Sequence, residues 1–148
     1  MCIRDRLQRV SQASISIESK DVTKIQNGLA IYIGVQKEDT EIVADLLVKK
    51  MTQYRVFPDK QNKINLSVLD VKGEILLIPQ VTLAIDTSKG LRPSFSDAAK
   101  PEHGNTLFDY VVKNTKKLGI KVESGIFGAD MRIMLVNEGP ITFWLECS

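Results

Sequence analysis

The sequence predicts an α+β fold, on three observations. Several short segments have the apolar or alternating pattern of β-strands, and two longer segments carry apolar residues at helical spacing. The helices do not alternate strictly with the strands, as they would in a parallel α/β fold. A chain of 148 residues can bury its own core, so residues 1–148 are expected to form a single domain.

The first half of the chain is predicted to form two strands, a helix and a short third strand. Polar and apolar residues alternate along 7–18, as in a half-buried strand, and 28–35 is a continuous apolar run typical of a central strand. A helix is expected to begin at Asp39 or Thr40, because either side chain can cap its first turn. Its expected core positions are Ile42, Val43, Leu46, Leu47 and Met51. The third strand is expected at 54–57.

The second half is predicted to contain one strand, a long loop and a second helix. The strand covers 74–84, and Pro79 within it is expected at a bulge or on an edge, because proline cannot donate to a ladder. Residues 86–101 are expected to form a loop, whose length favours a functional role. The helix, about 102–118, is expected to end at Gly119. Its expected apolar face consists of Leu107, Phe108, Val111, Val112 and Leu118.

Three strands are predicted to close the chain, at 121–126, 131–136 and 141–146. Residues 137–140 between the last two have the composition of a turn, which predicts a hairpin. A glycine followed by a proline is unusual at a hairpin tip. Gly139 allows close approach of the main chain, and Pro140 fixes its own φ near −65°.

The composition excludes several classes of function. The formal net charge is +2, from 20 Lys and Arg against 18 Asp and Glu, which is too balanced for a protein that grips DNA or RNA along its length. Contact with one end of a nucleic acid remains compatible with this charge. Cys2 and Cys147 give no disulfide framework and no metal-ligand spacing. There is no apolar run of membrane-spanning length and no signal peptide, so we expect a cytoplasmic protein without membrane contact.

The usual catalytic side chains are missing. His103 is the sole histidine, and its polar neighbours predict a surface position rather than a role in a catalytic triad. Cys147 has no histidine near it in sequence that could activate the thiol. No glycine-rich phosphate loop is present. The residues therefore predict no metal and no nucleotide cofactor.

Several short stretches, in their order along the chain, resemble the D-aminoacyl-tRNA deacylase family. The resemblance covers nearly all of the chain after residue 6. Its most specific parts are Gln80-Val81-Thr82-Leu83, Arg92-Pro93-Ser94-Phe95, 125–131 and Asn137-x-Gly139-Pro140-Ile141-Thr142. Further parts are Gln8-Arg9-Val10, 28–34, Tyr54-Arg55-Val56-Phe57 and Asn65-Leu66-Ser67.

The resemblance implies a homodimeric hydrolase with a barrel-like, mainly antiparallel or mixed β-sheet and two main helices. Members of this family cleave the ester between a D-amino acid and the terminal adenosine of tRNA, and we expect glycine to be removed as well. This activity proofreads the chirality of translation in the cytoplasm and needs no cofactor. The expected partners are therefore the acceptor end of aminoacyl-tRNA and a second copy of the chain.

The resemblance also assigns roles to particular residues. It implies catalytic positions at Gln80 and Thr82. Substrate contacts are implied for Pro79, Val81, Phe127 and Met131. A chirality filter is implied for Gly139 and Pro140, which would enter the partner's site.

Two departures keep alternatives open. Pro79 stands where the family commonly has serine, and Val81 where phenylalanine is common, so the stretch also resembles a related animal enzyme that removes L-alanine from mischarged tRNA. The segment 1–6 is longer than the N-terminal segment that is usual in the family. It also places Asp5 and Arg6 where apolar strand residues are expected. Both features are typical of a misassigned or artificial start. Because no general base is evident, a non-catalytic module that binds the tRNA end is the alternative from another class.

Overall fold

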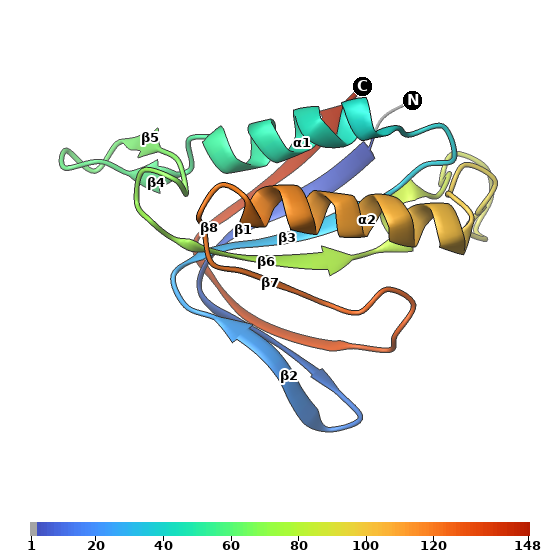
Figure 1. The fold of residues 1–148 in the computed structure, drawn as a ribbon, viewed down its shortest axis with the longest axis horizontal. Coiled ribbons are helices and arrows are strands. Elements are labelled where there is room, and N and C mark those ends of the chain that lie inside the picture. The colour runs from blue at the N-terminus through green and yellow to red at the C-terminus, as the bar shows by residue number, and fades with distance from the viewer. Residues whose placement is uncertain (1–2) are drawn as a thin grey trace.

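Two helices lie across one face of a strongly curved mixed sheet in the computed structural model, which describes residues 3–148 (Figure 1). The helices are α1 (Glu41–Gln53) and α2 (Pro101–Lys116). The strands of the main sheet are β1 (Ile3–Ile17), β2 (Lys20–Ile25), β3 (Gly28–Gly34), β6 (Glu74–Pro79), β7 (Val122–Ser124) and β8 (Arg132–Cys147). A small pair, β4 (Phe57–Pro58) and β5 (Ile64–Leu66), extends beyond α1.

The long strand β1 organises the sheet. One of its edges pairs with β3 along the first half and with β2 along the second, while its other edge pairs with β8. The strands β3, β6 and β7 follow in parallel. The Thr23 hydroxyl of β2 donates to the Glu123 carboxylate of β7 over 2.7 Å, so the two ends of the strand order meet. The sheet is nearly closed into a barrel, and the predicted α+β fold with a mixed, barrel-like sheet is confirmed.

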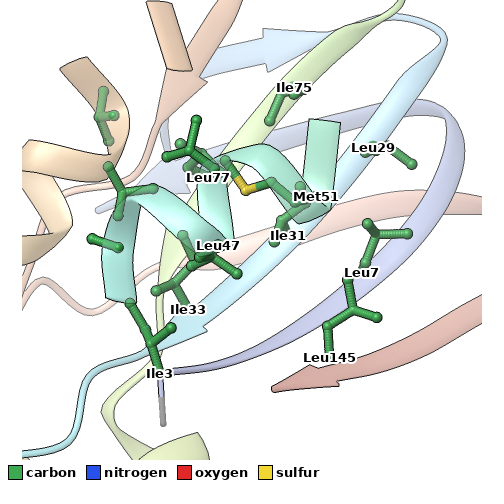
Figure 2. Packing of buried hydrophobic residues seen from close by; sticks show 14 of the residues in the cluster. Ile3, Leu7, Leu29, Ile31, Ile33, Leu47, Met51, Ile75, Leu77 and Leu145 are labelled. Carbon is green, nitrogen blue, oxygen red and sulfur yellow. The ribbon is translucent and has the colours of Figure 1, made fainter. Parts of the chain in front are cut away.

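The core has two parts, one on each face of the sheet. Leu29 and Ile31 of β3 lie in one buried cluster with Leu47 and Met51 of α1 (Figure 2). Ala30, between them in sequence, points the other way into a second cluster inside the barrel. Because both faces of β3 are covered, its sequence is continuously apolar rather than alternating.

Both helices lie where they were predicted, but part of each predicted apolar face was wrong. In α1 the buried side chains include Leu47 and Met51, as expected. Ile42 and Leu46, however, are 75% and 46% exposed. Leu118 lies beyond the end of α2 and is 48% exposed. The apolar residues recur with the period of a helix in both cases. The sheet, however, covers only part of the apolar face of each helix, and the remaining apolar residues stay exposed.

The strand predicted at 74–84 ends at Pro79, which is neither in a bulge nor on an edge strand. Gln80 N–H, next along, donates to Ile33 O of β3 over 2.8 Å, so the missing donor of Pro79 faces the β7 side. On that side β7 has already ended at Ser124, and no ladder bond is lost. Residues Val81–Ala84 form a short 3₁₀ helix, η1, instead of strand.

The predicted hairpin at 137–140 is wrong. Residues Arg132–Cys147 form one strand, β8, which stays paired with β1 on both sides of this stretch. Val10 pairs with Asn137 and Gln8 pairs with Thr142, so a single β1 residue lies opposite residues 138–141. The glycine and proline therefore lie in a large bulge of a continuous strand, which we call the 138–141 bulge.

Other strand boundaries also differ from the prediction. Strand β2 was not predicted, because it has few apolar residues and is largely exposed. The strand expected at 54–57 overlaps the observed β4, Phe57–Pro58, only at Phe57, and the strand expected at 121–126 shortens to Val122–Ser124.

Asp5 and Arg6 occupy positions of β1 with opposite environments. Asp5 is fully buried, and neither of its carboxylate oxygens accepts a hydrogen bond from another described residue. Burial raises the pKa of this carboxyl to about 7. Arg6 points outward and is exposed. Position 5 is therefore a buried position where an apolar residue would be expected, as the sequence analysis predicted, whereas position 6 is not.

None of the helices in residues 3–148 has the length and apolar character needed to cross a membrane.

Candidate active site

A hollow of about 640 Å³ opens where β6 ends. One wall consists of residues 79–81, at the junction of β6 and η1, and another of residues 127–129, after β7. The start of α2 contributes Pro101, Glu102 and Asn105. The hollow thus lies at the carboxyl end of β6 in the parallel part of the sheet, which is the edge where such sheets commonly bind ligands.

Gln80, in the wall of this hollow, is bonded to Thr82, which does not itself line the hollow. Gln80 Nε2 donates to Thr82 Oγ1 over 2.5 Å. The main chain of Gln80 is fixed by its bond to Ile33, so the amide side chain projects from a rigid strand end. Thr82 is exposed on η1, and no histidine, lysine or carboxylate of the described residues bonds its hydroxyl. An activated nucleophile would need such a base.

Phe127 lines the hollow and packs closely on α2. A β-carbon placed on Gly104 would lie 3.0 Å from its ring, so the glycine makes room for the aromatic side chain. Met131 lies elsewhere, packed against the barrel interior. Its sulfur and the Pro79 ring both lie against Gly125, where an added β-carbon would be 2.7 Å from the sulfur. Met131 therefore supports the wall behind Pro79 and does not line the hollow.

The 138–141 bulge is held by side chains in place of ladder bonds. Asn137 Oδ1 accepts from Ile141 N–H over 3.0 Å, and its Nδ2 donates to Thr142 Oγ1 over 2.9 Å. From β1, Arg9 Nε donates to Glu138 O over 3.1 Å, while its Nη1 donates to Val56 O over 2.8 Å. The roles of Arg9 and Asn137 were missed in the sequence, although both lie in stretches that carry the resemblance.

Gly139 and Pro140 are exposed at the tip of this bulge. The φ angle of Gly139 is +126°, in the region that favours glycine, and the peptide bond to Pro140 is cis. A β-carbon on Gly139 would lie 2.7 Å from Ile141 Cγ1 and 3.0 Å from Arg9 Nη2. No other residue type fits this position without a shift.

The hollow and the bulge lie near opposite ends of β3. Pro79 pairs with Ile33, whereas Arg9, which holds the bulge, pairs with Leu29. Four residues of strand correspond to about 13 Å. The bulge is also displaced sideways, because β8 lies on the far edge of β1. One chain therefore brings together Pro79, Gln80, Val81 and Phe127, with Thr82 beside them, and leaves Gly139 and Pro140 apart.

A second hollow, of about 380 Å³, lies between β1, β2 and β8. Gln12, Lys24 and Met134 contribute to its walls, and no residue with an expected catalytic or substrate-binding role lines it. His103 and Cys147, the two side chains considered above for nucleophilic catalysis, both lie in packed surroundings. His103 is half-buried rather than on the surface, with Nε2 2.9 Å from Asp39 O, and Cys147 is buried. Residues 3–148 contain no group of three or more His, Cys, Asp or Glu placed to hold a metal.

Comparison with known proteins identifies the family. A profile of the D-Tyr-tRNA(Tyr) deacylase family matches residues 6–146. The chain belongs to this family. It is 51% identical over 142 residues to a D-aminoacyl-tRNA deacylase of Pasteurella multocida, covering 95% of this chain and 96% of that protein. It is 50% identical over 140 residues to the Pseudomonas fluorescens enzyme of the same name, covering 95% and 97%.

Two solved structures share the fold of this D-Tyr-tRNA(Tyr) deacylase family member. One, of a c-Myc DNA unwinding element binding protein, has a TM-score of 0.91 at 30% identity and covers 96% of this chain and 97% of that chain. The other, of a probable eukaryotic D-amino acid tRNA deacylase, has a TM-score of 0.88 at 20% identity and covers 99% and 100%. The family resemblance predicted from the sequence is confirmed.

Proposed function

We propose that this chain hydrolyses the ester bond of D-aminoacyl-tRNA and of mischarged glycyl-tRNA, releasing free amino acid and tRNA as a proofreading step of translation in the cytoplasm. Family membership and the names of relatives near 50% identity support this function. The observation that carries it is the hollow at the end of β6, with Gln80 and Phe127 in its walls and Thr82 bonded to Gln80. Its volume suits a nucleoside with a small acyl group.

The complete site is formed by two copies of the chain. Gly139 and Pro140 are exposed on a supported bulge, but they lie away from the hollow of their own chain. A second copy can present its bulge to this hollow, and two-fold symmetry would then complete both sites at once. Sedimentation should show a dimer at micromolar concentration. A fully active monomer would contradict the shared site.

The bulge serves as a wall that excludes L side chains. An enzyme that accepts many D side chains cannot select by holding the side chain, so it must block the position where an L side chain would point. A wall made of main chain does this well only if it is rigid. The bonds from Arg9 and Asn137 support such rigidity.

The protein mainly positions the ester and stabilises the developing oxyanion. Gln80 N–H already donates to Ile33, so the oxyanion donors are the N–H groups of Val81 and Thr82. These lie in the first turn of η1, where N–H groups lack partners within the helix. Because no base lies beside Thr82, the attacking water is oriented by the substrate's own 2′-hydroxyl.

One assay tests the function and its alternatives. Protein at substoichiometric concentration is mixed with D-Tyr-tRNA, Gly-tRNA and L-Ala-tRNA, and release of amino acid is followed. We expect repeated turnover of the first two and little release of L-alanine. Fast release of L-alanine would favour the alternative suggested by Pro79 and Val81. Binding without turnover would favour a non-catalytic nucleic-acid module, an alternative that the DNA-binding name of the 30% identical protein allows.

A further inference from the structure

One face of α2 connects the hollow to a group of lysines. Residues 102 and 105 of α2 line the hollow. Continuing from them in steps of three or four residues leads to 109, 112 or 113, and 116, so these positions share one face of the helix. The far end of this face carries Lys113, Lys116 and Lys117 around a shallow hollow of its own. We call these three residues the α2 lysines.

The α2 lysines have no partners within residues 3–148. All three are exposed, and none has a carboxylate within ion-pair distance. Two other lysines near the helices, Lys121 and Lys50, are engaged. Lys121 pairs with Glu74 at 3.5 Å, and Lys50 donates to Glu146 O over 3.1 Å. The α2 lysines are therefore free cations concentrated on one stretch of helix.

The acidic residues of this face lie nearer to the hollow. Glu102 lines it, and Asp109 lies beside the first lysine. The far end of the face thus carries three positive charges against one negative charge. A polyanion would be attracted to this far end of the helix face.

We infer that the α2 lysines contact the phosphate backbone of the base-paired acceptor stem while the terminal adenosine occupies the hollow. This inference rests on the proposed function. The helix rise places Lys113 to Lys117 about 12–18 Å beyond Asn105, a gap for the unpaired end of the tRNA to cross. Phosphate contacts carry no sequence information, as an enzyme that serves many tRNAs requires. An A-form stem is recognised mainly through its backbone and shape.

The test compares a long and a short substrate. The variant Lys113→Ala/Lys116→Ala/Lys117→Ala should keep its fold, because the side chains are exposed and alanine favours helix. With D-Tyr-tRNA we expect KM to rise about tenfold and the slope of log KM against log salt to fall by about 2 to 3. With D-tyrosyl-CCA, which has no stem, kcat/KM should stay unchanged. The matched control is Lys20→Ala/Lys60→Ala/Lys63→Ala, which removes the same charge from exposed, unpaired lysines elsewhere.

The outcomes separate this inference from the proposed function. A parent protein that hydrolyses neither substrate would refute the function itself. If the parent hydrolyses both and the α2 variant matches the control on tRNA, the inference fails alone. An equal loss on D-tyrosyl-CCA would also overturn it, because the lysines would then act at the hollow.

Two further measurements sharpen the assignment. Asp109→Asn removes the negative charge next to the lysines, so KM for D-Tyr-tRNA should fall about twofold, again without effect on D-tyrosyl-CCA. Competition by an RNA hairpin stem should exceed competition by a DNA duplex of equal length. Equal competition, lost equally in the triple variant, would show a general polyanion surface and contradict binding of an RNA stem.

Discussion

The two regions for which we propose a function are built in opposite ways. At the end of β6, Gln80 lines an open hollow and is joined to Thr82 by one side-chain bond. At the 138–141 bulge, Arg9 and Asn137 fix the main chain through several hydrogen bonds. The contrast follows from the tasks proposed for them. A region that receives a substrate must be open, whereas a region that excludes one enantiomer must not yield.

The largest expected effect concerns the stability of the sheet at Asp5 of β1, two strands away from β6. Asp5 pairs with Ile33, the residue that also pairs with Pro79. Burial raises the pKa of Asp5 to about 7, and the nearby charge of Lys50 lowers it only in part. The folded protein therefore holds this proton up to about pH 7, whereas the unfolded chain releases it near pH 4. Stability contributed by the protonated group is full below pH 4 and falls as pH rises to 7.

Asp5→Val should abolish this decrease in stability between pH 4 and pH 7. The free energy of unfolding at pH 8 should rise by up to about 4 kcal/mol, the equivalent of a shift of about three pKa units, and the gain should shrink toward pH 4. Chemical denaturation at several pH values measures it. Asp5→Asn, which keeps the size and removes the charge, should also abolish the pH dependence between 4 and 7. Discrimination of D from L substrates should be unchanged, and a change would show that the two regions are not independent.

The second effect is expected at the bulge. Gly139→Ala places a β-carbon 2.7 Å from Ile141 in a backbone conformation with φ of +126°. Such strain costs about 1–3 kcal/mol, so either activity or the ratio of D to L hydrolysis should fall about 10- to 100-fold. Parallel deacylation assays with D-Tyr-tRNA and L-Tyr-tRNA measure it. Gly119→Ala is the control, because that glycine also has positive φ but nothing lies within 4 Å of the added carbon. Unchanged discrimination in Gly139→Ala would place the filter elsewhere.

The sequence predicted the location of both regions, but it predicted the wrong backbone structure for the second one. The family stretches located the β6 end and the Gly139-Pro140 pair, and periodicity located both helices. The hairpin predicted in place of the bulge was wrong, because a turn-like composition between two apolar runs cannot show that both runs pair with the same strand. That information lies in β1, whose Gln8 and Val10 keep their pairing on either side. Likewise, the support given by Arg9 depends on contacts about 50 and 130 residues away, which no local pattern encodes.

A smaller effect is expected from loosening the bulge. Arg9→Met keeps the aliphatic stem but loses the bonds to Glu138 O and Val56 O. The bulge should remain but move more freely, so D over L discrimination should drop about threefold to tenfold with D-Tyr-tRNA hydrolysis largely retained. Arg55→Met, which removes a bond to Asn65 but leaves both bonds of Arg9 in place, is the control. If both variants behave alike, the rigidity of the bulge does not depend on Arg9.

The smallest effect is expected at the open region itself. The Thr82 hydroxyl is bonded by the Gln80 amide, which cannot take a proton from it. If the protein only positions the ester, Thr82→Ala should lower kcat about tenfold or less, whereas loss of a nucleophile costs orders of magnitude. A substrate that ends in 2′-deoxyadenosine, acylated on the 3′ oxygen, should instead bind normally and react very slowly. Single-turnover rates of both substrates with both proteins separate the cases. An inactive Thr82→Ala protein together with normal turnover of the deoxy substrate would make Thr82 the nucleophile, and the open region would then carry out chemistry that its side chains give no sign of supporting.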